Sequence, residues 1–131
     1  MQKKLLYVLL SCFFFLSFSQ SLSDYIVIDQ FGYRPISTKI AIIRNPVTGF
    51  DSSTNYTPGD SCAVVDANTG DIVFQNTISE WKNGLEDEDS GDQLWHFDFS
   101  SVETVGSYYI LDISNNTVSY THLTLPTTSR V

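Results

Sequence analysis

The chain has 131 residues, a formal net charge of −8 and a sequence pI of about 4.3. Hydrophobic residues make up 42% of it and charged residues 17%, a balance typical of one globular domain and not of a disordered chain. The excess of carboxylates argues against nucleic-acid binding, because neutralising phosphates requires clustered Lys and Arg.

The N-terminal segment has the three parts of a secretory signal peptide. Lys3 and Lys4 supply a positive start, residues 5–18 are apolar apart from two serines, and small serines follow. The apolar run is short for a membrane span, which needs about 20 residues. We therefore assign residues 1–23 to a signal peptide cleaved after Ser21 or Ser23, and expect a secreted or cell-surface protein. An uncleaved anchor is the alternative.

The two cysteines have different expected fates. Leu9-Leu10-Ser11-Cys12 is similar to a bacterial lipoprotein box, whose cysteine is acylated, so a lipid anchor at Cys12 is a further alternative. The apolar run continues beyond Cys12, whereas a lipoprotein turns polar there. Removal of the signal peptide would leave Cys62 as the single cysteine, with no partner for an intramolecular disulfide. Cys62 lies in a strand-like run, which predicts a buried, unreactive thiol.

The body of the chain, residues 24–117, is predicted to be all-β. Short β-branched and aromatic runs alternate with turn signals, and no useful stretch has helical periodicity. A polar loop is expected over 45–60 and an acidic loop over 82–92. Seven or so short strands in this length predict a two-sheet sandwich, without the Cys-Trp-Cys framework of an antibody-type domain. The expected strands cover 25–29, 38–44, 61–66, 71–75, 77–81, 93–99 and 107–113.

Two features of the body predict its register. Residues 67–70 (Ala-Asn-Thr-Gly) form a tight-turn signal that predicts a β-hairpin, since Gly70 can take a positive φ. Alternation over 93–99 places Trp95, Phe97 and Phe99 on one face, which should be the buried one. Alternation over 107–113 places two sets of side chains on opposite faces of the strand. These are Tyr108, Ile110 and Asp112 on one face and Tyr109, Leu111 and Ile113 on the other.

The last segment reads as foreign sequence. Residues 118–127, Val-Ser-Tyr-Thr-His-Leu-Thr-Leu-Pro-Thr, match one translated frame of a transposon-based sequencing-library adapter. We therefore assign residues 118–131 to an adapter and not to a domain, and give His122 no functional role. A genuine Thr-rich linker is the alternative.

Few side chains in the body suggest chemistry. The carboxylates of Glu86–Asp92 could bind calcium, but their spacing departs from the EF-hand pattern and favours a solvated acidic loop. Trp81, which has polar neighbours, and Trp95 could stack on sugar rings, although Trp95 alternates in phase with core residues. His96 has no metal partners at ligand spacing. We assign no catalytic residue, cofactor-binding residue or metal ligand.

Four motifs in order resemble the Ig-like domain that precedes the catalytic domain of many family-nine glycoside hydrolases. The opening Ile26–Pro35 (Ile-Val-Ile-Asp-Gln-Phe-Gly-Tyr-Arg-Pro) continues into Lys39-Ile40-Ala41. The hairpin around Gly70, the run Trp95–Ser100 and the run Gly106–Tyr109 follow. The resemblance covers nearly all of 25–113 and implies an immunoglobulin-like β-sandwich. The chain departs from the pattern at Asp29, where Asn is usual and a local turn should weaken, and in the 45–60 insertion, expected to be a tolerated loop.

The resemblance also implies a parent enzyme and a role for this domain. The parent would be a cellulase that hydrolyses internal β-1,4-glucan bonds with inversion, using a carboxylic acid and a carboxylate base in a helical barrel that follows. This chain would then be a truncated, non-catalytic domain that buttresses the barrel, with the Tyr33 hydroxyl free for the partner domain. The alternatives are a stand-alone carbohydrate-binding or adhesion module, and an enzyme complete in this chain.

Overall fold

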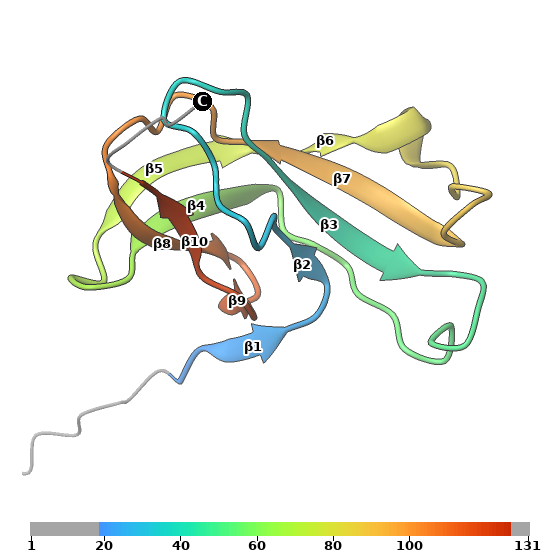
Figure 1. The fold of residues 1–131 in the computed structure, drawn as a ribbon. Helices are drawn as coiled ribbons and strands as arrows, with labels where there is room; N and C mark the ends of the chain where they lie inside the picture. The colour runs from blue at the N-terminus through green and yellow to red at the C-terminus, as the bar shows by residue number, and fades with distance from the viewer. Residues whose placement is uncertain (1–18, 127–131) are drawn as a thin grey trace, which may run out of the picture.

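The computed structural model describes residues 19–126, which fold as two β-sheets packed face to face (Figure 1). Within that range the only helical segment is a short 3-10 turn, η1 (Trp81–Gly84). No helix in the described part is long and apolar enough to cross a membrane. The predicted all-β sandwich is therefore confirmed.

The larger sheet has the strand order β1-β9-β8-β4-β5, with β10 also pairing with β8. The β4–β5 hairpin is the one predicted from Gly70, whose φ is +76°. Strand β4 pairs with β8 from Cys62 opposite Asp112 to Asp66 opposite Tyr108. The strands are β1 (Ser21–Ser23), β4 (Ser61–Asp66), β5 (Ile72–Thr77), β8 (Gly106–Asp112), β9 (Thr117–Ser119) and β10 (Leu123–Leu125).

The smaller sheet has the strand order β2-β3-β7-β6 (Figure 1). Its strands are β2 (Ile26–Val27), β3 (Ile40–Pro46), β6 (Ser79–Glu80) and β7 (Asp92–Asp98). The long antiparallel β3–β7 pair runs from Ile40 opposite Asp98 to Pro46 opposite Asp92. Two predicted strands are shorter than expected, since only two residues of 25–29 pair and Trp81 belongs to η1.

The main core lies between the sheets and is built from the predicted alternation. Phe97 and Phe99 are fully buried and stack with ring centroids 5.9 Å apart. Ile110 from the larger sheet and Ile43 from the smaller one complete its centre. Burying a side chain of this size contributes roughly 1.5–3 kcal/mol, so these residues dominate the stability of the fold. A second, smaller cluster lies on the other face of the larger sheet and comprises Ala63, Val65, Leu111 and Val118.

The 45–60 loop is attached to the body, unlike the loosely tolerated insertion that the sequence suggested. The Tyr56 ring stacks on Tyr25 at 4.9 Å, and its hydroxyl donates a 2.6 Å hydrogen bond to Asp112. At the other end, Arg44 binds both Asp51 and Asp92 at 2.7 Å. These contacts tie the insertion to both sheets, because Asp112 lies in β8 and Arg44 in β3.

Both ends of the described range join the larger sheet, through β1 at its edge and β10 beside β8. Ser21–Ser23, which we assigned to the signal peptide, form β1 and pair in parallel with β9. Residues 118–125, which we assigned to an adapter, supply part of β9 and all of β10, and Leu123 and Leu125 are buried. An alternating Leu-Thr-Leu run suits an open sheet edge whatever its origin. The cleavage position and the adapter origin both stay predictions.

Candidate functional site: the corner between β2 and β3

The loop that joins β2 to β3 holds the opening motif, and its first turn is built by a side chain. The Asp29 carboxylate accepts a 2.8 Å hydrogen bond from the Phe31 amide, an Asx turn. The expectation that Asp29 weakens this turn is wrong, because an aspartate oxygen accepts from the amide as an asparagine oxygen would. Gly32 follows with a φ of +86°, a conformation that glycine adopts without strain.

The Tyr33 side chain stabilises this corner through hydrogen bonds to the backbone on both sides of it. Its hydroxyl accepts a 2.9 Å hydrogen bond from the Asp29 amide and donates one of 3.3 Å to the Ile40 carbonyl. Its ring meets Phe99 edge-on at 5.3 Å. Burial raises the pKa of the Tyr33 hydroxyl above its ordinary value. The expectation that this hydroxyl is left for a partner domain is therefore wrong, since both of its hydrogen-bonding roles are filled within the corner.

Lys39 holds the second half of the corner and is fully buried. Its Nζ donates hydrogen bonds of 2.6 Å to the Pro35 carbonyl and 2.9 Å to the Ser37 carbonyl, with a longer one of 3.5 Å to Arg34. Burial lowers the pKa of Lys39, although the nearby carboxylates of Glu103 and Asp98 oppose that shift. The motif Lys39-Ile40-Ala41 does not by itself predict this structural role of the Lys39 side chain.

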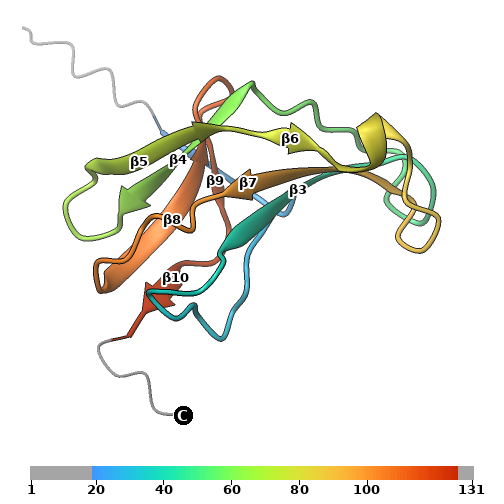
Figure 2. The same ribbon diagram turned by 90° about the horizontal axis from the view of Figure 1, so that it is seen from above.

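The locked backbone leaves two apolar side chains facing outward. Phe31 is 99% exposed and Ile36 is 85% exposed. Strand β10 lies beside this corner, and the Tyr33 amide donates a 3.0 Å hydrogen bond to the Thr124 carbonyl (Figure 2). Strand β10 therefore lies next to Tyr33. A rigid corner with outward apolar groups is suited to packing against another surface.

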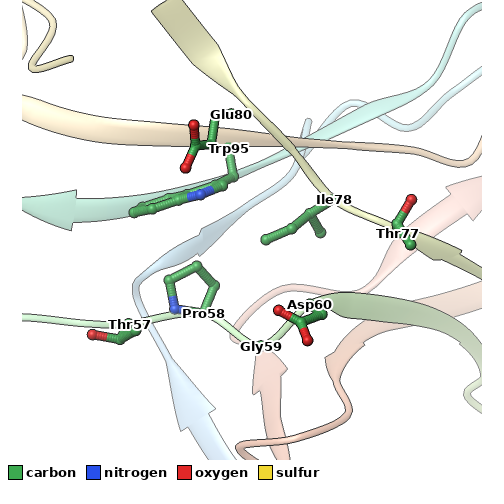
Figure 3. Close-up of a pocket in the computed structure, with 8 residues that line it drawn as sticks. All are labelled: Thr57, Pro58, Gly59, Asp60, Thr77, Ile78, Glu80 and Trp95. Carbon is green, nitrogen blue, oxygen red and sulfur yellow. The ribbon is translucent and has the colours of Figure 1, made fainter. Parts of the chain in front are cut away.

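A second feature is a pocket of about 440 Å³ lined by residues 57–60, residues 77–80 and Trp95 of β7 (Figure 3). Trp95 lines it, with Pro58 and Ile78 as the other apolar groups and Asp60 and Glu80 as its carboxylates. Trp95 also packs against the main core but is only partly buried. The prediction that it lies on the buried face of its strand is therefore confirmed only in part.

The other candidates from the sequence have structural partners. Trp81 stacks on His96 at 5.0 Å and remains 41% exposed. In the acidic loop, Asp87 pairs with Lys82 at 2.9 Å and accepts a hydrogen bond from the Ser90 amide, which lowers the pKa of the Asp87 carboxyl. Asp92 was placed in a solvated loop, but it is buried in β7 against Arg44.

Two buried groups near the hairpin also have defined partners. The Cys62 thiol is free and buried, and burial, with a smaller contribution from Asp112, raises its pKa to about 12. The Asp112 carboxylate accepts hydrogen bonds from Tyr56, from the Gly59 amide at 3.0 Å and from Asn115. The predicted buried thiol is confirmed. Within residues 19–126, no group of three or more potential metal ligands gathers at one place.

Together, the two-layer arrangement, the hairpin and the locked opening motif define an Ig-like β-sandwich domain. Residues 22–117 match the family model described as the cellulase N-terminal Ig-like domain, and the chain belongs to that family. The match ends at Thr117, directly before the adapter-like string. A search of curated proteins gave no match.

Solved structures of family-nine enzymes contain a similar domain. A Bacteroides ovatus GH9 protein has 22% sequence identity and a TM-score of 0.57, over 79% of this chain and 16% of that one. A metagenome-derived glycoside hydrolase family 9 endoglucanase has 27% identity and a TM-score of 0.56, over 76% and 17%. A Zn-binding triple mutant of the family 9 endoglucanase J30 has 26% identity and a TM-score of 0.53, over 72% and 14%. The chain thus spans about one sixth of the length of these proteins.

Proposed function

We propose that this chain carries the accessory, non-catalytic domain of an exported cellulase, and that the domain stabilises a catalytic domain that follows it. Membership of the cellulase N-terminal Ig-like family supports the parent class. The observation that carries the docking role is the pair Phe31 and Ile36, exposed on a corner that Tyr33 and Lys39 hold rigid. Large apolar groups held outward on a fixed backbone can be buried without the further cost of ordering that backbone.

The proposed reaction of the parent is endo-hydrolysis of β-1,4-glucan with inversion. Two of the similar structures are described as endoglucanases, which supports the substrate class. The acid and the base would lie in the catalytic domain, spaced to admit a water molecule between base and substrate. The Ig-like domain would act on that chemistry only by holding the catalytic domain in its folded shape.

The docking role can be tested in the full-length parent, recovered from its gene. Burying Phe31 and Ile36 at an interface would contribute roughly 3–6 kcal/mol in total. The double variant Phe31→Ser/Ile36→Ser should split one cooperative calorimetric transition into two and lower the melting temperature of the catalytic domain. Phe50→Ser is the matched control, because Phe50 is 100% exposed but lies in the loop after β3. A single transition unchanged by the double variant would refute docking at this corner.

Export is the second part of the proposal. It rests on the charged, apolar and small-residue parts of 1–23, whose first 18 residues lie outside the described range. Strand β1 distinguishes the two expected sites, because cleavage after Ser23 would remove the β1–β9 pairing and cleavage after Ser21 would keep the pairs of Leu22 and Ser23. Mass spectrometry of the mature N-terminus checks this, and an acylated Cys12 there would replace free secretion with a lipid anchor.

A further inference from the structure

Three segments that are distant in sequence enclose the pocket at Trp95. Residues 57–60 lead into β4, residues 77–80 join β5 to β6, and Trp95 comes from β7 (Figure 3). The Ile78 amide donates a 3.1 Å hydrogen bond to the Asp60 carbonyl, which fixes the first two segments to each other. Glu80 pairs with Trp95 in the β6–β7 ladder, which fixes β7 relative to residues 77–80. The pocket is therefore preformed by backbone hydrogen bonds.

The lining combines an aromatic face with hydrogen-bond acceptors. The Trp95 indole, the Pro58 ring and Ile78 supply its apolar lining, as Figure 3 shows. Within residues 19–126, the carboxylates of Asp60 and Glu80 take part in no side-chain hydrogen bond or salt bridge. They are thus available to a ligand. The volume lies within the range of small-ligand sites, which is about 300–1,000 Å³.

We propose that this pocket binds a sugar unit of a neutral, β-linked glucan. The C–H face of a pyranose ring packs on an indole, and its hydroxyl groups donate to carboxylates, so one Trp with two acidic side chains meets both requirements. Two carboxylates repel acidic sugars, which selects a neutral one. The choice of glucan among neutral sugars rests on the proposed function of the parent.

A quaternary ammonium ion is the competing ligand for an aromatic ring beside carboxylates. Such ions are held by aromatic cages, in which several rings surround the cation. The residues that line this pocket include a single aromatic ring, Trp95. The lining therefore fits a flat sugar face better than a spherical cation.

Tryptophan fluorescence provides the binding assay. The sequence has two tryptophans, so Trp81→Phe leaves Trp95 as the sole reporter. Titration of that purified chain with cellotetraose should give a saturable change in emission. Glu80→Gln and Asp60→Asn, made in the same background, keep the shape of the pocket and should each weaken binding about tenfold through loss of a charge-assisted hydrogen bond. Glu86→Gln, outside the pocket, is the control and should bind unchanged.

Several outcomes would overturn the proposal. These are no saturable response up to about 10 mM cellotetraose, equal affinity in the Glu80→Gln, Asp60→Asn and control chains, or equally effective displacement by tetramethylammonium. Circular dichroism of each variant confirms that the fold is retained. The assay is independent of the docking test, because it uses neither Phe31 nor Ile36. Failure of sugar binding would leave interdomain coupling intact, and loss of coupling would leave sugar binding intact.

Discussion

Replacing Lys39 by Met tests whether a buried ammonium group holds the β2–β3 corner. Methionine keeps the length and apolar stem of the side chain but removes the charge and the donors. The Pro35 and Ser37 carbonyls, now bound at 2.6 and 2.9 Å, would lose their donor. The corner that presents Phe31 and Ile36 should then loosen.

The size of the effect follows from two opposing contributions. Hydrogen bonds to a charged group contribute about 1.5–3 kcal/mol each, so two short ones contribute roughly 3–6 kcal/mol. Burying the ammonium group without a salt-bridge partner costs several kcal/mol, and methionine avoids that cost. Because the loss of these hydrogen bonds outweighs the recovered desolvation cost, we expect the free energy of unfolding to fall, by no more than about 3 kcal/mol.

Urea unfolding of the chain, followed by tryptophan fluorescence, measures this change. Lys82→Met is the matched control, because Lys82 is half-exposed and pairs with Asp87 on the surface, and its loss should change stability little. Amide exchange of residues 34–37 should accelerate in Lys39→Met and not in the control. A Lys39→Met chain as stable as the parent, or more stable, would show that the ammonium group does not support the corner.

Three further predictions concern buried groups. Asp112→Ala should cost about 3 kcal/mol in urea unfolding, because the Tyr56 hydroxyl loses its partner in the anchored loop, and a cost within about 0.5 kcal/mol would contradict this. Phe97→Ala should cost about 3–5 kcal/mol by the same measurement, and an unchanged midpoint would argue against a core at this site. The pKa of the Cys62 thiol is raised from its ordinary value of 9.0 to about 12 in the folded chain. The unfolded chain therefore ionises first, so the contribution of this thiol to stability is complete below pH 9 and is lost as the pH rises towards 12. In a Cys12→Ser chain, a thiol reagent at pH 9 should label Cys62 only as fast as the protein unfolds, and rapid labelling of the native state would contradict the burial.

The sandwich could be predicted from sequence because its signals are local. Alternation over 93–99 placed Phe97 and Phe99 in the core, and the turn ending at Gly70 specified the β4–β5 hairpin. Both depend on residues within one strand or one turn, where the side-chain period of two decides which face is buried.

The details of the corner and the loop could not be predicted, because they depend on partners far along the chain or on backbone atoms. The buried Lys39 ammonium group donates its hydrogen bonds to backbone carbonyl groups. No pattern of side chains in a sequence indicates which carbonyls will accept them. Tyr56 reaches Asp112 across 56 positions, so the 45–60 segment looked like a free insertion. Trp95 follows the core alternation, yet it also lines a pocket whose other walls are residues 57–60 and 77–80, which are distant from it in the sequence.

We propose that this Ig-like domain serves a catalytic domain encoded beyond Thr117, and that residues 118–131 belong to an adapter. Sequencing the source genome through the Thr117 codon tests it most directly. We expect an open frame that replaces Val118–Val131 and continues into a family-nine glycoside hydrolase catalytic domain. The same 14 codons in the genome, followed by a stop, would contradict it.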